Sequence, residues 1–327
     1  EVAMKPHAVL SNALTLFLVL LFWGSNAVSA EKIKVITTVA PLTNIVHNVG
    51  GDRIDLHGLI PEGTDSHTFE PAPSDVRYIA EGDLFLINGL TLETPSEKLI
   101  LANKKKTARI VKLGDHTITR KEWVFDFSFP ASGGNPNPHL WLNVAYAMKY
   151  VELTRDALIA SDPANKAYYE KNAKAYLERL DRLDKAIMTA METIPPKNRK
   201  LVTYHDSWAY FCPRYGCKVI GAIQPSSFAE PSPRDMANLI DQLKAEQVPA
   251  VFGSEVFPSK VLDQIGREAG VKYISSLRDD DLPGPLGSPE HSYIGMMVED
   301  VKAMASSLGG DDSALLEIKT ADVIPPR

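Results

Sequence analysis

The sequence predicts an α/β protein with two similar parallel-sheet lobes joined by one long rigid helix. Three observations lead to this class. Strand-like and helix-like segments alternate after Glu31, which is the pattern of parallel sheets covered by helices. The order of segments recurs in the second half, and a long amphipathic stretch separates the halves. A chain of 327 residues with 44% hydrophobic content can bury cores for two domains.

Residues 1–30 have the pattern of a secretory signal peptide. Met4 and Lys5 precede an apolar run, ALTLFLVLLFW, and the segment ends in Val28-Ser29-Ala30. We expect cleavage after Ala30. No cysteine lies near this cut, so the sequence predicts a periplasmic protein without a lipid anchor.

The first half, residues 31–162, is predicted to form the N-terminal lobe. Its elements are a strand in KIKVITTV, a helix from Pro41, a strand in RIDLHGLI, a helix opened by PAPSD and a strand in DLFLINGL. The second half, 197–327, repeats the order with KLVTYH, SWAYFCPRY and a stop at Gly216, CKVIGAI, a helix opened by PSPRD, and VPAVFGSEV. A duplicated lobe follows from this repetition.

The two helix openers share the pattern E-P-x-P-x-D, at Glu70–Asp75 and Glu230–Asp235. Proline suits the first helical turn, and an aspartate two residues later faces the unpaired amides there. We therefore interpret Asp75 and Asp235 as helix caps.

Residues 163–196 are predicted to be the helix that links the lobes. After VAYAMKYVELTRDALIAS, apolar residues recur three and four apart from Ala164 to Thr193, and Pro195-Pro196 ends the pattern. Such a helix is roughly 45 Å long, and it predicts an interlobe cleft with limited opening. The loop 114–138, containing FDFSFPASGGNPNP, has no clear period and is longer than a connector requires.

Charge and cysteine content narrow the function. The net charge of −6 and scattered basic residues give no basic stripe, so we expect no nucleic-acid partner. The two cysteines, Cys212 and Cys217, are either a short-range disulfide or two small buried residues, and the sequence leaves both open.

Three histidines fall at ends of predicted elements, where parallel sheets bind ligands. His67 follows the second strand, His139 precedes the central helices, and His205 ends the first strand of the second half. Three imidazoles in one cleft favour a metal site.

Six segments together resemble the cluster A-I (ZnuA/TroA-like) zinc and manganese substrate-binding proteins of ABC importers: GLIPEGTDSHTFEPAPSD, INGLTLE, NPHLWLN, VTYHDSWAYFCPRYG, AEPSPRD and HSYIGMM. The resemblance spans about Lys32 to Leu308, and LRDDDLPG is most similar to the AztC-type zinc subgroup. It implies a non-catalytic periplasmic receptor that delivers metal to a membrane permease. A monomer, and a periplasmic metallochaperone as a further partner, are also expected.

The resemblance implies four ligands, one from each of four segments: His67, His139, His205 and Asp280, with Asp279 and Asp281 as alternatives. Histidine at position 205, where manganese-selective relatives carry glutamate, favours Zn²⁺, with Mn²⁺ as the alternative cargo.

The sequence departs from the family pattern beside the second histidine. Asn137-Pro138-His139 replaces D-P-H and Asn143-Val144 replaces D-P, which puts the orientation of His139 in doubt. A rival class is an exported zinc metallohydrolase, because three histidines and a water also form catalytic zinc sites. The absence of H-E-x-x-H opposes it.

Overall fold

The computed structural model describes residues 31–224, 232–254, 256 and 260–325. The predicted signal peptide, residues 1–30, lies outside this part of the chain, as do Glu230 and Pro231 of the second helix opener. Residues 32–327 form one compact unit. Among the described residues, no helix has both the length and the apolarity that crossing a membrane requires.

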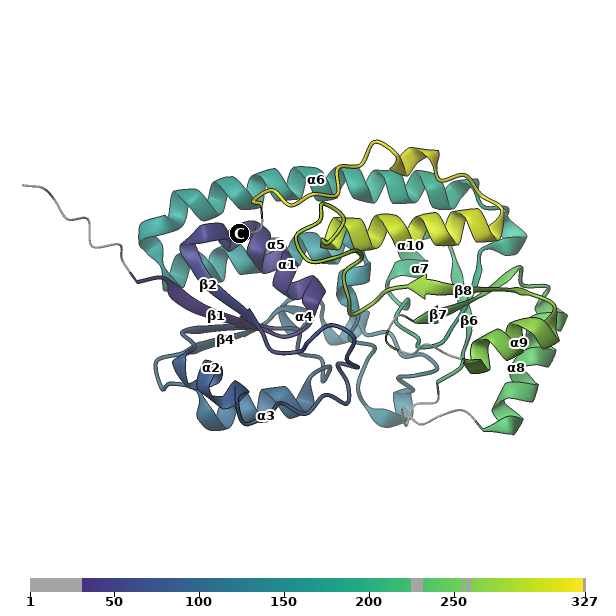
Figure 1. The fold of residues 1–327 in the computed structure, drawn as a ribbon, viewed down its shortest axis with the longest axis horizontal. Coiled ribbons are helices and arrows are strands. Elements are labelled where there is room, and N and C mark those ends of the chain that lie inside the picture. The colour runs from purple at the N-terminus through teal and green to yellow at the C-terminus, as the bar shows by residue number, and fades with distance from the viewer. Residues whose placement is uncertain (1–30, 225–231, 255, 257–259, 326–327) are drawn as a thin grey trace, which may run out of the picture. The chain divides into compact units, whose positions relative to one another are not determined.

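The first lobe is built on a four-stranded parallel sheet in the order β2-β1-β3-β4 (Figure 1). Its strands are β1 (Ile33–Thr37), β2 (Ile54–Gly58), β3 (Leu84–Ile87) and β4 (Arg109–Lys112). Its helices are α1 (Ala40–Gly50), α2 (Asp75–Glu81), α3 (Thr94–Asn103) and α4 (Leu113–Thr117). All four residues of β3 are buried, as expected for a central strand covered on both faces.

The second lobe repeats this topology, with a parallel sheet in the order β6-β5-β7-β8. Its strands are β5 (Lys200–Thr203), β6 (Lys218–Ala222), β7 (Ala250–Ser254) and β8 (Lys272–Leu277). Its helices are α7 (Phe211–Tyr215), α8 (Pro233–Glu246), α9 (Lys260–Ala269) and α10 (Tyr293–Leu308). Because each strand corresponds in order to one of the first sheet, the predicted duplication is confirmed.

Along the sequence, the two sheets are separated by two long helices, α5 (Val144–Ser161) and α6 (Lys166–Thr193). Helix α6 has 28 residues and is therefore about 42 Å long. It buries a stripe of residues three and four apart, and this stripe contacts α1, α5 and α10. In Figure 1, α6 and α10 lie side by side, and α6 runs above both lobes. The long helix is as predicted, whereas the domain limits at 162 and 196 remain a prediction.

In both helix openers the aspartate accepts a hydrogen bond from a preceding backbone amide, although Asp75 is the first residue of α2 and Asp235 is the third residue of α8, where it forms a capping box with Ser232. Asp75 Oδ2 accepts a hydrogen bond from the Ala72 N–H at 2.8 Å, and Asp235 Oδ2 accepts one from the Ser232 N–H at 3.1 Å. Each aspartate thus satisfies the backbone amide three residues before it.

Other expectations needed adjustment. Strands β4 and β8 were not anticipated, because each is the exposed or half-exposed edge of its sheet and lacks a continuous apolar run. Cys212 and Cys217 form a disulfide, which decides between the two alternatives left open above. Gly216, with φ of 76°, ends α7 in the left-handed conformation that favours glycine.

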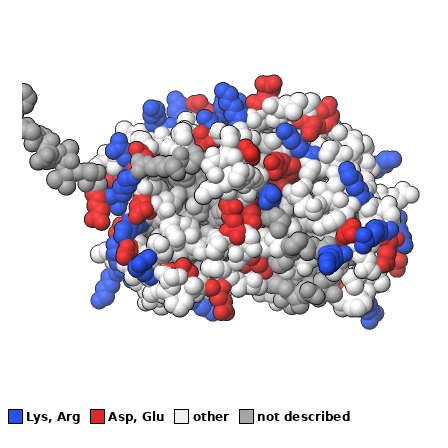
Figure 2. All heavy atoms as spheres, viewed as in Figure 1, with Lys and Arg blue, Asp and Glu red and all other residues white. Residues whose placement is uncertain are grey.

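Charged side chains of both signs are interspersed on the face shown in Figure 2. On the face shown in Figure 2, lysine and arginine lie mostly toward the margins and alternate with aspartate and glutamate.

Candidate metal centre

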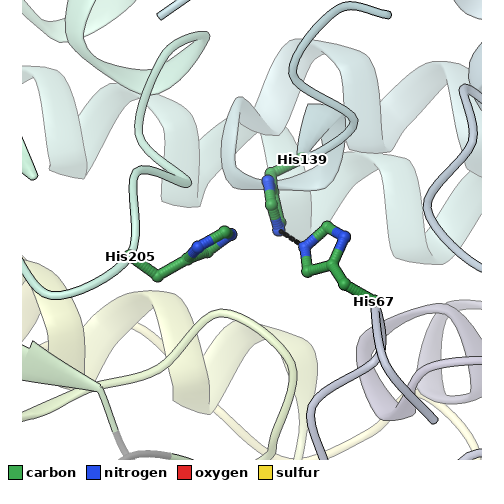
Figure 3. Close-up of side chains that lie close together, drawn as sticks. All are labelled: His67, His139 and His205. Carbon is green, nitrogen blue, oxygen red and sulfur yellow. Dashed lines mark hydrogen bonds between the residues drawn. The ribbon is translucent and has the colours of Figure 1, made fainter. Parts of the chain in front are cut away.

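Three histidines from separate segments converge on one point (Figure 3). His67 lies in the loop between β2 and α2, His139 directly precedes the short helix Leu140–Leu142, and His205 follows β5. One ring nitrogen from each lies within 4.8 Å of the others. The ring centroids are 5.2 Å apart for His67 and His139, 5.0 Å for His67 and His205, and 4.9 Å for His139 and His205. Such spacing allows one ion to contact all three nitrogens.

Topology explains the convergence of two of these side chains. Strands β2 and β5 both end at the carboxyl edge of a parallel sheet, and the loops that follow them carry His67 and His205. This edge is where open α/β sheets bind ligands. The first residues of the predicted loop 114–138 belong to α4, and the remainder, 118–138, returns the chain to the start of α5, which brings His139 to the same place.

Amide side chains fix the orientation of the buried imidazoles. The Oδ1 atom of Asn137 accepts hydrogen bonds from the backbone N–H and the ring Nδ1–H of His139, both at 2.9 Å. The Oε1 atom of Gln224 accepts one from His205 Nδ1 at 3.0 Å. Because an amide oxygen can only accept, Nδ1 is protonated in both rings, and Nε2 carries the lone pair that could bind a metal ion. Asparagine at 137 therefore orients His139, contrary to the doubt raised by the departure from D-P-H.

Burial keeps the imidazoles neutral. Removal from water lowers the pKa of His67 and of His139 well below the usual range, and the neighbouring His205 lowers both further. Burial also lowers the pKa of His205, while the negative charge of Asp279 opposes this. Nε2 of His67 lies 3.3 Å from Nε2 of His139. Neutral nitrogens directed at one another are ready to bind a cation.

The three consecutive aspartates lie beside the histidines, and each has a different contact. Asp279 Oδ2 accepts a short hydrogen bond from the Ser207 hydroxyl. Asp280 Oδ2 accepts a long one, 3.4 Å, from the Ser66 N–H, and Asp281 Oδ2 accepts one of 2.7 Å from the Gly63 N–H. Within the described residues, the group of mutually close ligand atoms holds the three histidines and does not include Asp280.

Apolar rings surround the histidines. Trp141 is fully buried, lies 5.1 Å from the His139 ring between centroids, and donates its Nε1–H to the Asp279 carbonyl at 2.8 Å. Trp208 and Tyr204 are also buried, and Phe69 packs against the core. The ring of Phe129 also lies close to all three histidines.

Two buried carboxyl groups adjoin the site. Burial and, to a lesser degree, the charge of Asp126 raise the pKa of Asp206 to about 8. Burial likewise raises the pKa of Asp126 to about 6. Asn137 Nδ2 donates to Asp126 Oδ2 at 2.7 Å and to the Asp206 carbonyl at 2.5 Å. The amide of Asn137 therefore connects this acidic pair to His139.

Sequence reasoning missed two groups that act at the site. Gln224 stands at the end of CKVIGAIQ and carries no motif that marks it as the partner of His205. Phe129 lies in the long aperiodic loop, so the loop itself was the available signal, but no pattern distinguished this phenylalanine from Phe125 and Phe127.

Comparisons with known proteins agree with this geometry. Residues 35–307 match the family model described as ZnuA, zinc-uptake complex component A, periplasmic. The manganese ABC transporter substrate-binding lipoprotein PsaA of Streptococcus pneumoniae is 28% identical over 306 residues, which cover 91% of this chain and 98% of PsaA. The iron-binding protein YfeA of Yersinia pestis is 29% identical over 281 residues, 86% of this chain and 88% of YfeA.

Among solved structures, the periplasmic zinc-binding protein TroA of Treponema pallidum superposes with a TM-score of 0.78 at 26% identity. The match covers 85% of this chain and 99% of TroA. These proteins are named for manganese, iron and zinc respectively, so likeness alone does not select the ion.

The same names correct one expectation. Relatives such as PsaA are named lipoproteins, and the prediction of a protein without a lipid anchor is therefore wrong. That prediction rested only on the lack of a cysteine near Ala30, which concerns one attachment chemistry at one predicted cleavage point.

Proposed function

The chain belongs to the ZnuA family of periplasmic metal-binding receptors of ABC importers, and from this premise we propose that it captures Zn²⁺ with His67, His139, His205 and Asp280. Members of this family are substrate-binding proteins and not enzymes, so the metallohydrolase alternative is dropped. Such receptors deliver their cargo to a membrane permease that works with an ATPase. The observation that carries the proposal is the convergence of three neutral imidazole nitrogens within 4.8 Å.

The choice of Zn²⁺ over Mn²⁺ is supported by the donor atoms. Zinc favours nitrogen ligands in tetrahedral geometry, whereas manganese favours carboxylate, carbonyl and water oxygens. Three of the four proposed donors are nitrogens, and His139 and His205 are buried. The zinc assignment also supports membership of the AztC-type subgroup, which we include in the proposal.

Asp280 is proposed as the fourth ligand because it falls best on the family's ligand position and its carboxylate contacts the segment that carries His67. Asp279 and Asp281 accept hydrogen bonds at short and ordinary distances, whereas the bond from Ser66 to Asp280 is long, at 3.4 Å. Ser66 directly precedes His67, so a small shift of the Asp280 carboxylate toward the histidines keeps it beside this loop. A carboxylate there completes a four-coordinate site and offsets one positive charge of the ion.

A competition titration tests the proposal. The wild-type protein should bind about one zinc per chain and retain it over excess manganese, as measured by elemental analysis after gel filtration. His67→Ala, His139→Ala and His205→Ala should each weaken zinc binding at least about 100-fold. His116, an exposed histidine in α4, provides the matched control, and His116→Ala should bind like the wild type. Unchanged affinity in all three site variants would refute the site.

The fourth ligand is tested in the same titration. Asp280→Ala should cost more zinc affinity than Asp279→Ala or Asp281→Ala. A larger loss for Asp279→Ala would move the assignment to Asp279, whose charge already acts on His205.

The proposal also includes a monomeric receptor loaded by a periplasmic metallochaperone. Sedimentation equilibrium of the zinc-loaded protein should give the mass of one chain. Zinc transfer from a chaperone should be faster than transfer from free chelator at equal zinc activity.

A further inference from the structure

The ring of Phe129 covers the metal centre. Its centroid lies 5.3 Å from the His67 ring, 5.8 Å from the His139 ring and 5.8 Å from the His205 ring. It therefore contacts all three imidazoles, two of which belong to segments far from Phe129 in the chain.

The same ring borders solvent. A cavity of about 420 Å³ is lined by His67, Ser128, Phe129, Pro130 and neighbouring residues of the loop and of α3. Phe129 is partly buried, as is His67. The ring of Phe129 thus stands between this cavity and the buried rings of His139 and His205.

A tight turn holds Phe129 in place. The Asp126 N–H donates to the Phe129 carbonyl at 3.0 Å, and the Phe129 N–H donates to Asp126 Oδ1 at 2.8 Å. The other carboxylate oxygen of Asp126 accepts the bond from Asn137 described above. The turn is therefore attached to the residue that orients His139.

The turn is also attached to the segment of His205. The Phe127 N–H donates to Asp206 Oδ2 at 3.3 Å, and the Asp206 N–H donates to Ser128 Oγ at 3.3 Å. Because β5 and its loop belong to the second lobe, the position of Phe129 depends on both halves of the molecule. The turn is thus bonded to residues next to His205 and close to His139 in the chain.

The neighbouring aromatic residues behave differently. Phe125 and Phe127 are exposed by 39% and 53%, and Phe125 packs its ring edge-on to Trp123. One phenylalanine of the three in FDFSF faces the histidines, and two face solvent. This contrast supplies a matched control within a single turn.

We propose that Phe129 is a specificity-determining lid that excludes water from the bound ion and slows its release. A benzene ring offers no lone pair, so an ion beneath it cannot add water ligands on that side. Ions that need five or six ligands, such as Mn²⁺, lose more binding affinity when water is excluded than Zn²⁺, which needs only four ligands. This inference rests on the proposed zinc-binding function, and it gives the long loop 114–138 a role.

The test uses Co²⁺ as a spectroscopic substitute for zinc in the full-length protein. Four-coordinate Co²⁺ absorbs visible light strongly, and added water ligands weaken the bands. Phe129→Ala should lower this absorption at least about threefold. It should also raise the rate of zinc release to excess chelator about tenfold or more, and reduce the preference for zinc over manganese. Phe129→Leu, which keeps an apolar side chain there, should restore most of both properties.

Phe127→Ala is the control, and it should leave the Co²⁺ spectrum and the release rate at wild-type values. The inference is overturned if Phe129→Ala also keeps both, or if Phe127→Ala changes them equally. A purely structural role for Phe129 would lower the melting temperature without changing the Co²⁺ bands. Should Phe129→Ala fail to fold, Phe129→Val decides, because its smaller side chain uncovers part of the ion and should change both readouts in the same direction. Failure of the wild-type protein to bind zinc or Co²⁺ would instead refute the proposed function.

Discussion

Replacement of Asn137 by alanine should damage both the fold and the metal centre. The Asn137 side chain is fully buried and makes four hydrogen bonds, two accepted from His139 and two donated to Asp126 and Asp206. This uses the whole hydrogen-bonding capacity of a carboxamide. In Asn137→Ala, four buried polar groups each lose one partner.

The size of the effect follows from these partners. A buried group that loses its partner costs about 1–3 kcal/mol, and water that enters the space left by the amide offsets part of this. We expect the metal-free protein to lose about 2–4 kcal/mol of unfolding free energy. Loss of the oxygen that orients His139 should weaken zinc binding about 10–100-fold.

Urea unfolding of the metal-free protein and chelator competition for zinc measure the two effects. Asn137→Asp separates them, because it keeps the oxygen that accepts from His139 but replaces the donor with an oxygen facing Asp126. It should therefore lose stability while keeping more zinc affinity than Asn137→Ala. Asn135→Ala, an exposed change on the same segment, is the control. The reasoning is refuted if Asn137→Ala unfolds within about 0.5 kcal/mol of the wild type and binds zinc equally well.

Two further predictions concern stability. Burial raises the pKa of Glu93 to about 7, above its value of about 4.3 in the unfolded chain. The contribution of this side chain to the unfolding free energy is therefore complete below pH 4 and is lost as pH rises through 7. Between pH 5 and 8, the unfolding free energy of Glu93→Gln should therefore fall less than that of the wild type, by an amount on the order of 3 kcal/mol, as measured by urea unfolding. Parallel pH profiles of the two proteins would contradict this. Replacing both Cys212 and Cys217 with alanine should cost roughly 2 kcal/mol by loop-closure entropy, because the disulfide closes a short loop. Zinc stoichiometry should not change in that variant, and a loss of zinc would show that the disulfide shapes the site.

Local patterns in the chain were sufficient for most of the fold. The buried apolar run of β3 and the spacing of apolar residues in α6 predict their elements directly, because burial on two faces or along one stripe requires those patterns. Strands β4 and β8 were not predicted, because edge strands with exposed residues do not require a continuous or periodic apolar pattern.

The lid of the site could not be predicted in the same way. Three alternate residues of one loop are phenylalanines, Phe125, Phe127 and Phe129, and no sequence pattern distinguishes the one that lies against the histidines. Their difference arises from bonds between Asp126, Asp206 and the loop backbone, which join segments about 80 residues apart.

The sequence by itself determined the duplicated α/β lobes, the linking helix and the three histidines. These depend on periodicity and on the positions of residues at element ends, both of which are local properties. Only the tertiary structure decided that Asn137 and Gln224 orient the imidazoles and that Phe129 covers them. The physical reason is that hydrogen bonds and ring contacts depend on distances between segments far apart in the chain, which are fixed only when α1, α5, α6 and α10 have packed against one another.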